Sequence, residues 1–318
     1  MEALHTPVLL EETIQYLAPR GKGELMLDAT TGEGGHSFAF LSRFPDLKII
    51  AIDADPLIQQ AAKERLGEFG DRVYFYSGWA QSFFASYPGD LKRPDTVLMD
   101  LGISMFHYVK SGRGFSFRKD EPLDMRLDTS SGPDAADLIA ALPEKDLADL
   151  IYRNAGEPYS RRIAKAIVKA RKEGAIRSSG ALAELVEAAV PPAYRHRAVH
   201  PATKTFQALR IAVNGDLSRL PDLLEGGLRT LKAGGRMGVI SFHSSEDRIV
   251  RNFFREKSRD CTHSPEAPID RYEGRRLVNL LTRKGLTPGK AERQKNPPSR
   301  SARLRVVEKI LELEEDGK

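Results

Sequence analysis

The stretch Asp28-Ala-Thr-Thr-Gly32-Glu-Gly34-Gly35-His36 decides the fold of this chain. It lies between a short apolar run, Leu25-Met-Leu27, and a predicted helix that begins near Ser37. Glycines at a strand-to-helix turn let backbone N–H groups approach a ligand, because no Cβ stands in the way. The stretch therefore predicts an α/β fold with a small-molecule site at this turn.

The turn lacks the residues that bind phosphates. A P-loop needs Lys and then Ser or Thr after its last glycine, and His36-Ser37 stands there instead, which argues against a nucleoside triphosphate. The spacing also departs from Gly-x-Gly-x-x-Gly, and Asp28 would repel a pyrophosphate. Asp53 ends the next apolar run, where a carboxylate can accept both ribose hydroxyls. Adenosine with a cationic tail fits best, which indicates S-adenosylmethionine; the alternative is an ordinary tight turn.

The chain has 318 residues and a hydrophobic content of 41%. Its size and composition predict a soluble, cytoplasmic protein. No stretch approaches the ~20 apolar residues of a membrane span, and the N-terminus has no signal-peptide pattern. The single cysteine, Cys261, excludes an internal disulfide. The close pairs of ligand type are His196/His200 and Cys261/His263, and Pro201 biases His200 away from helical geometry, so we expect no metal site.

Basic residues are concentrated in two regions. The net charge is +5, but residues 271–305 carry eleven Lys or Arg and two Glu, a local balance of +9. In the middle of the chain, Arg161, Lys165 and Lys169 form an i, i+4 stripe on a predicted helix. Each region is either a solvated surface or a track for phosphates. Two such regions favour a nucleic-acid partner, and together they could line a groove.

Strand-like runs alternate with helical patterns in the first third of the chain, which predicts βαβ units and a parallel sheet. Thr6 and Pro7 are expected to start a leading helix over Val8 to Leu17. The predicted strands are 24–28, 48–53, 73–76, 96–100 and 236–242, and the predicted helices among them are 37–43, 56–66 and 217–231.

Residues 113–214 contain no convincing strand but several helical stretches: 135–141, 144–152, 161–172, 181–190 and 203–213. We therefore predict a discontinuous α/β domain over 1–112 and 215–318, with a helical domain inserted over 113–214.

Long motifs that match those of one known family occur along almost the whole chain, in the same order. They are His5-Thr-Pro-Val-Leu-Leu-Glu-Glu12, Asp28 with Gly34-Gly-His-Ser37, Ala51-Ile-Asp-Ala-Asp-Pro56, Met99-Asp-Leu-Gly-Ile-Ser104, Arg113-Gly-Phe-Ser-Phe117, Pro122-Leu-Asp-Met-Arg126, Arg161-Arg-Ile-Ala-Lys-Ala-Ile167, His200-Pro-Ala-Thr-Lys-Thr-Phe-Gln-Ala-Leu-Arg210, Ile240-Ser-Phe-His-Ser-Ser-Glu-Asp-Arg248 and Asn296-Pro-Pro-Ser-Arg-Ser-Ala302. With these motifs the chain resembles the ribosomal RNA small subunit methyltransferase H family, also called MraW.

The resemblance implies a Rossmann-like class I methyltransferase fold whose helical insertion binds the substrate. It implies transfer of a methyl group from S-adenosylmethionine to the exocyclic N4 of one cytidine in the decoding region of 16S ribosomal RNA. The family's cofactor contacts fall on Gly34, Gly35, His36, Asp53, Ala80, Asp100 and His107. At His107 the family usually has Gln, so this chain departs from the pattern there. Trp79, beside Ala80, is either an adenine wall or a core residue.

Two residues are candidates for the chemistry. Asp100 and His243 follow strands whose carboxyl ends should meet at one crevice, and either can hold the amino group of cytosine and accept its proton. For His243, the alternative is a position just before the helix caps Ser244 and Ser245. Phe115 and Phe117 either stack on a splayed base or anchor the loop that enters the insertion.

Two further functions are compatible with the residues alone: a nicotinamide-dependent oxidoreductase, if the glycine turn holds a pyrophosphate, and a non-catalytic RNA-binding assembly protein. The oligomeric state is open at this stage.

Overall fold

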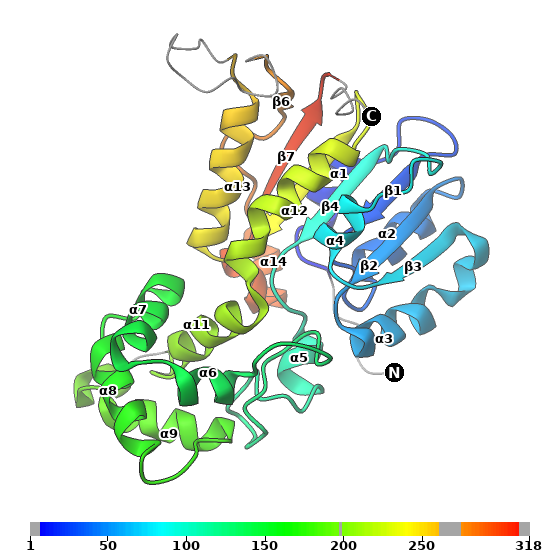
Figure 1. The fold of residues 1–318 in the computed structure, drawn as a ribbon. Helices are drawn as coiled ribbons and strands as arrows, with labels where there is room; N and C mark the ends of the chain where they lie inside the picture. The colour runs from blue at the N-terminus through cyan, green and yellow to red at the C-terminus, as the bar shows by residue number, and fades with distance from the viewer. Residues whose placement is uncertain (1–6, 197–198, 261–274, 312–318) are drawn as a thin grey trace. The chain divides into compact units, whose positions relative to one another are not determined.

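The computed structural model describes residues 7–196, 199–260 and 275–311. Its two compact units are Met1–Gly102 with Ser218–Lys318, and Ile103–Leu217 (Figure 1). The first boundary precedes the one expected at 112/113, because the segment that contains α5 (Met105–Val109) groups with the helical unit. Thr6, Cys261, His263 and Arg271, which carry parts of the sequence-based expectations, lie outside the described residues.

The first unit is built on a seven-stranded sheet with the order β3-β2-β1-β4-β5-β7-β6. Neighbouring strands from β3 to β5 are parallel, whereas β7 is antiparallel to both β5 and β6. The strands are β1 (Leu25–Asp28), β2 (Lys48–Asp53), β3 (Val73–Ser77), β4 (Thr96–Asp100), β5 (Arg236–Ser241), β6 (Val278–Leu280) and β7 (Arg303–Lys309).

Both faces of this sheet are buried, as expected for parallel strands whose crossover helices cover them. Successive side chains point to opposite faces. Leu27 therefore packs in one apolar cluster with Leu224 of α12, and its neighbour Met26 packs in another with Phe40 of α2. The helices and 3₁₀ turns of this unit are α1 (Leu10–Leu17), α2 (Gly35–Arg43), α3 (Pro56–Leu66), η1 (Gly67–Arg72), α4 (Ala80–Ala85), α12 (Asp216–Thr230), α13 (Ser244–Lys257), α14 (Lys290–Lys295) and η2 (Pro297–Ser301).

The named elements of the second unit are helices. A core that includes Ile151, Ile163, Val186 and Leu209 joins α7, α8, α9 and α11. The basic stripe lies on α8, where Ile163 and Ile167 are buried while the three basic side chains are exposed. The helices are α5 (Met105–Val109), α6 (Ala135–Ala141), α7 (Glu144–Ala155), α8 (Ser160–Ala170), α9 (Ser179–Ala189), α10 (Pro192–Arg195) and α11 (Thr203–Asn214).

The leading helix begins later than expected. Leu9 adopts a left-handed φ of 54°, so α1 starts at Leu10 instead of Val8. The backbone N–H of Leu9 donates to Glu292 Oε1 of α14 over 2.7 Å, which ties this turn to a helix near the other end of the chain. Leu9 is fully buried.

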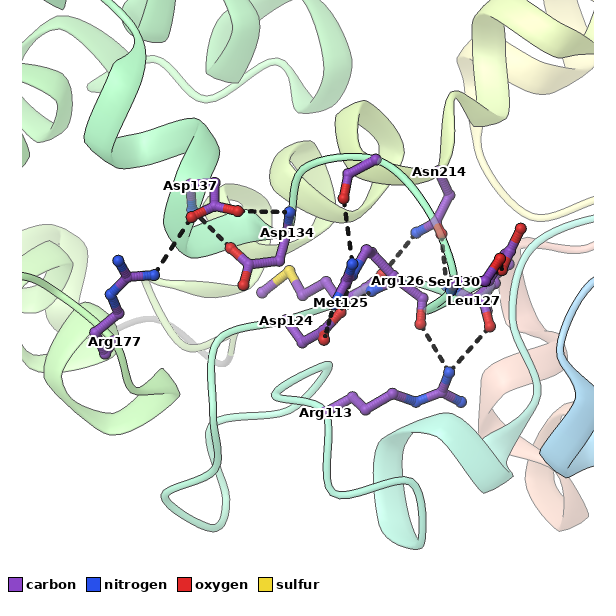
Figure 2. Close-up of polar contacts among 12 residues, drawn as sticks. Arg113, Asp124, Met125, Arg126, Leu127, Ser130, Asp134, Asp137, Arg177 and Asn214 are labelled. Carbon is purple, nitrogen blue, oxygen red and sulfur yellow. Dashed lines mark hydrogen bonds and ion pairs between the residues drawn. The ribbon is translucent and has the colours of Figure 1, made fainter.

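The loop that enters the helical unit is held by Arg113 (Figure 2). The Arg113 side chain is buried and donates to the carbonyls of Arg126 and Leu127, at 2.8 and 3.1 Å. Asn214 of α11 receives the Leu127 N–H and donates to the Met125 carbonyl, which fixes a positive φ of 61° at Met125. Arg113 therefore stabilises the loop.

The two phenylalanines of this loop differ in exposure. Phe115 is buried in the helical core, which supports the anchoring alternative. Phe117 is partly buried and packs against the rings of His200 and Phe206, with centroids 4.5 and 4.9 Å away.

The basic segment near the C-terminus is partly sheet, which sequence reasoning missed. Arg305 lies in β7, is buried, and forms an ion pair with Asp247 of α13 at 2.7 Å. Arg303 also faces Asp247, at 3.8 Å. The buried Arg305 cannot be counted with the solvated charges, whereas the Arg303 side chain is 42% exposed. The exposed basic residues of the segment are Arg275, Arg276, Arg283, Lys284, Lys290, Arg293, Lys295 and Arg300.

Candidate active site

Three carboxylates end neighbouring strands of the parallel sheet. Asp28 ends β1, Asp53 ends β2 and Asp100 ends β4. Because these strands are parallel and adjacent, their carboxyl ends share one edge of the sheet. In this type of sheet ligands bind beyond that edge, so it is the candidate site.

The glycine turn folds back over this edge. The N–H of Thr31 donates to the carbonyl of Ile52 over 2.9 Å, and the N–H of Gly34 donates to the carbonyl of Thr31 over 2.8 Å. Gly34 then adopts a φ of 77° as the N-cap of α2. The turn is thus tied to β2 before the helix begins.

Asp53 joins the turn to the second strand. Its Oδ2 accepts the N–H of Gly32 at 2.8 Å, and its Oδ1 accepts the N–H of Asp55 at 2.9 Å. An ionised carboxylate has about four acceptor positions, so it can accept ribose hydroxyls as well as backbone N–H groups. Asp53 therefore shapes the turn and can also bind a ligand.

The two glycines of the turn are required for packing. A Cβ on Gly34 would lie 3.1 Å from Cδ1 of Leu66, which is buried, and a Cβ on Gly35 would lie 2.7 Å from Cγ of Pro7. The space beside each glycine is thus filled by the protein's own side chains.

Asp28 is a buried carboxyl group behind the turn. The Ser37 hydroxyl donates to its Oδ2 over 2.5 Å. Burial raises the pKa of Asp28 to about 6, the Ser37 hydroxyl opposes this, and the nearby charge of Asp53 adds to it. The Asp28 carboxylate is therefore partly protonated under mildly acidic conditions.

Asp100 is the least satisfied of the three carboxyl groups. Its backbone N–H donates to Thr30 Oγ1 over 2.6 Å, but its buried Oδ1 receives no hydrogen bond from any residue that the structure describes. Burial raises the pKa of Asp100 well above its usual range, and the charges of Asp28 and Glu246 add to the effect. A buried acceptor without a donor is costly, which favours a ligand as the donor.

His36 lies next to Asp100. The ring is buried, with Nδ1 3.5 Å from Asp100 Oδ2 and Nε2 3.2 Å from the carbonyl oxygen of Val8. His36 therefore bridges β4 and the segment that precedes α1.

His243 is itself the N-cap of α13, so Ser244 is the first helical residue and not the cap. Its Nδ1 accepts the N–H of Glu246 at 3.4 Å, and its Nε2 lies 2.9 Å from Glu246 Oε1. Glu246 also receives the N–H groups of Phe242 and His243, at 2.9 and 3.3 Å. Both ring nitrogens of His243 thus face Glu246.

The predicted contacts Ala80 and His107 belong to different units. Ala80 begins α4 and is buried, while its neighbour Trp79 is only partly buried, with the Arg219 guanidinium 4.2 Å from the ring centroid. His107 belongs to the helical unit, where it is buried with its ring 5.3 Å from that of Phe115. The structure thus brings together Gly34, Gly35, His36, Asp53 and Asp100 in the first unit, while His107 lies in the second.

Sequence reasoning assigned no role to Glu246, Thr30 or Val8. A signal for Glu246 exists, because His243-Ser-Ser-Glu246 has the spacing of a capping box. No sequence signal marks a backbone carbonyl such as that of Val8. In the described part of the chain, no group of three or more His, Cys, Asp or Glu can hold a metal ion, and no helix is long and apolar enough to cross a membrane.

The sheet order, with its antiparallel β7 between β5 and β6, and the acidic residues at the ends of β1, β2 and β4 define a class I methyltransferase with a Rossmann-like fold. A family model described as the MraW methylase family matches residues 2–310. The chain belongs to this family, and the predicted fold class is confirmed.

Known proteins similar to this chain cover nearly all of it. A ribosomal RNA small subunit methyltransferase H of Treponema denticola is 53% identical over 310 residues, covering 98% of each chain. The protein of that name from Syntrophobacter fumaroxidans is 46% identical over 311 residues, covering 96% of each. Among solved structures, a ribosomal RNA methylase from Streptococcus thermophilus matches with a TM-score of 0.40 at 11% identity, covering 97% of this chain and 100% of that one.

The two glycines of the turn with positive φ should respond differently to alanine. Gly32→Ala meets only Ile58 Cδ1 at 3.9 Å, so its cost is the left-handed backbone, about 1–2 kcal/mol. Gly34→Ala adds the contact with Leu66 and should lose roughly 1–3 kcal/mol more. Urea unfolding followed by the fluorescence of Trp79, the single tryptophan, reports on this unit. Equal losses in the two variants would show that Leu66 moves aside without cost.

Proposed function

We propose that this protein transfers a methyl group from S-adenosylmethionine to the exocyclic N4 of a cytidine in the decoding region of 16S ribosomal RNA. The observation that carries the proposal is the buried Oδ1 of Asp100 at the carboxyl edge of the sheet, beside the glycine turn, which receives no hydrogen bond from the described part of the chain. Membership in the MraW methylase family supports the same reaction.

The donor set fits S-adenosylmethionine. When bound, this cofactor supplies a methyl group on a sulfonium sulfur, and its charge is positive. Asp53 is the acceptor proposed for the ribose hydroxyls. The backbone of Gly34 to His36, at the start of α2, is proposed to line the ligand position at the turn. The acidic edge attracts a cationic group and repels a pyrophosphate, which disfavours a nicotinamide dinucleotide. Ala80 and His107 are the other proposed cofactor contacts.

The N4 amino group is a weak nucleophile, because its lone pair is delocalised into the ring. An acceptor for an N4–H helps to localise that lone pair and takes the proton after transfer. We assign this role to Asp100, whose carboxyl group has unused acceptor capacity. His243 is the second candidate: its Nδ1 accepts the N–H of Glu246 in the helix cap, whereas its buried Nε2 lies 2.9 Å from Glu246 Oε1 and makes no hydrogen bond with any residue that the structure describes. Positioning of the two reactants supplies the remaining catalysis.

The helical unit, close to the predicted 113–214 insertion, is proposed to bind the RNA. The exposed Arg161, Lys165 and Lys169 form one candidate phosphate-binding surface, and the exposed basic residues of 275–300 form another. The partner is the small ribosomal subunit or its RNA, and the proposed location is the cytoplasm. No metal is needed, because the sulfonium is already a strong electrophile.

Mass-spectrometric mapping of modified cytidines in ribosomal RNA tests the function. We expect one N4-methylated cytidine in the decoding region of cells that carry the protein, and its loss in cells without it. Purified protein with labelled S-adenosylmethionine should restore the label to small subunits from the deficient cells. An unchanged cytidine map would refute the proposed substrate.

Replacement of Asp53 should weaken cofactor binding. Asp53→Ala removes a charged acceptor for the ribose and should cost of order 1.5–3 kcal/mol of binding free energy by calorimetric titration. Asp53→Asn retains one acceptor oxygen for the Gly32 N–H but turns its NH2 toward the Asp55 N–H, so it preserves part of the turn and its loss should be smaller. An alanine variant that binds as tightly as the wild type would exclude Asp53 from the ligand site.

Neutralising the stripe on α8 should weaken RNA binding, because fewer phosphates of the RNA are then neutralised. With Arg161, Lys165 and Lys169 replaced by Gln, the log–log salt slope should fall by roughly 0.7–0.9 for each phosphate that the protein no longer binds, with cofactor binding unchanged. The control replaces the exposed Lys145 and Arg153 of α7 by Gln.

Arg275→Gln with Arg276→Gln tests the second surface, where we expect the same direction of change. If the salt slope of the α8 variant matches that of the α7 control, α8 does not contact the RNA.

A further inference from the structure

We propose that His36 is a positioning residue that keeps Asp100 in its carboxylate form, so that Asp100 can accept the proton that N4 of cytosine loses. The inference rests on the proposed function and deepens it. It assigns the side chain of His36 a part in proton transfer, beyond the contact with the methyl donor that the family resemblance implies.

The two neighbours of the His36 ring carry the argument. Nε2 faces the carbonyl oxygen of Val8 at 3.2 Å, and Nδ1 faces Asp100 Oδ2 at 3.5 Å. A carbonyl and a carboxylate can only accept hydrogen bonds, whereas a neutral imidazole has one donor and one acceptor. The imidazolium has two donors and satisfies both neighbours. Beside an Asp100 carboxylate the ring is therefore matched to the charged form, whereas beside the protonated acid, which can donate to Nδ1, a neutral ring satisfies both contacts.

The negative charges around Asp100 also favour a positively charged neighbour. Asp28 from β1 and Glu246 from α13 both act on Asp100, and burial with these two carboxylates raises the pKa of Asp100. Burial and these two carboxylates favour the protonated acid, which cannot accept a proton. The positive charge on His36 opposes the protonation of Asp100 at close range, in a buried site where screening by solvent is weak.

The Val8 carbonyl is held in place by the chain around it. Val8 is buried, and Pro7 packs against the turn so closely that a Cβ on Gly35 would clash with it. Leu9 takes the left-handed conformation and donates its N–H to Glu292 Oε1. The segment 7–9 therefore fixes the ring of His36 from the side opposite Asp100.

The proton balance of the step is simple. N4 of cytosine forms a bond to the methyl carbon as the carbon–sulfur bond breaks, and that electron pair stays on sulfur. N4 then loses one proton, which the Asp100 carboxylate accepts. His36 keeps its own proton throughout and neutralises the carboxylate before the transfer. Asp100 later releases the proton to water.

The pH dependence of methyl transfer tests this role. In His36→Gln, Asp100 loses its counter-charge, so the acid limb of the kcat profile should move to higher pH by on the order of 1–3 units, with activity recovered at higher pH. Asp28→Asn removes a neighbouring negative charge instead and should move the same limb to lower pH. A uniform loss of activity with an unmoved limb in both variants would overturn the proposal.

A second measurement does not depend on activity. Nitrogen-15 NMR of the full chain without substrate should show both His36 ring nitrogens protonated at neutral pH, and one of them deprotonated in Asp100→Asn. A neutral ring in the wild type would overturn the inference even if methyl transfer is normal. A protonated ring in a protein that methylates no RNA would instead refute the proposed function and leave the ion pair standing.

Discussion

Negative charge gathered at the carboxyl edge of a buried sheet is the constraint on which the rest of the site depends. Parallel strands must end at one edge, and here three of them end in aspartate. Each carboxylate is compensated differently: Asp53 by backbone N–H groups, Asp28 by a hydroxyl, and Asp100 by an imidazole ring. The compensation is least complete at Asp100, which is where the proposed chemistry occurs.

Much of the fold could be predicted from periodicity and apolar patterning. β2, β4, α3 and α6 begin and end as expected, because each has a clear apolar face or run and a polar or proline boundary. β6 and β7 were missed. β7 contains several basic residues, and Asp247, the ion-pair partner of Arg305, lies far away in the sequence. Arg305 was therefore interpreted as a solvated charge, although it is buried in that ion pair.

The site was predictable in its residue types and less so in its contacts. Asp53 and Asp100 follow from their positions at the ends of strands, and Gly34 follows from the glycine turn between β1 and α2. The environment of His36 does not follow, because it depends on the Val8 carbonyl, which only the folded chain brings close, whereas the contact of His243 with Glu246 is indicated by their capping-box spacing. The turn at Leu9 was also hidden, since a left-handed leucine has no sequence signal and is held by Glu292.

The position of β7 has a consequence for synthesis of the protein. This strand is synthesised after both β5 and β6, yet it lies between them in the sheet. Until it leaves the ribosome, β5 presents an open edge of unpaired backbone groups, the kind of surface on which chains associate wrongly. The bond from Leu9 to Glu292 forms equally late. A chain released before β7 is made thus has the glycine turn but lacks the strand that pairs with both β5 and β6.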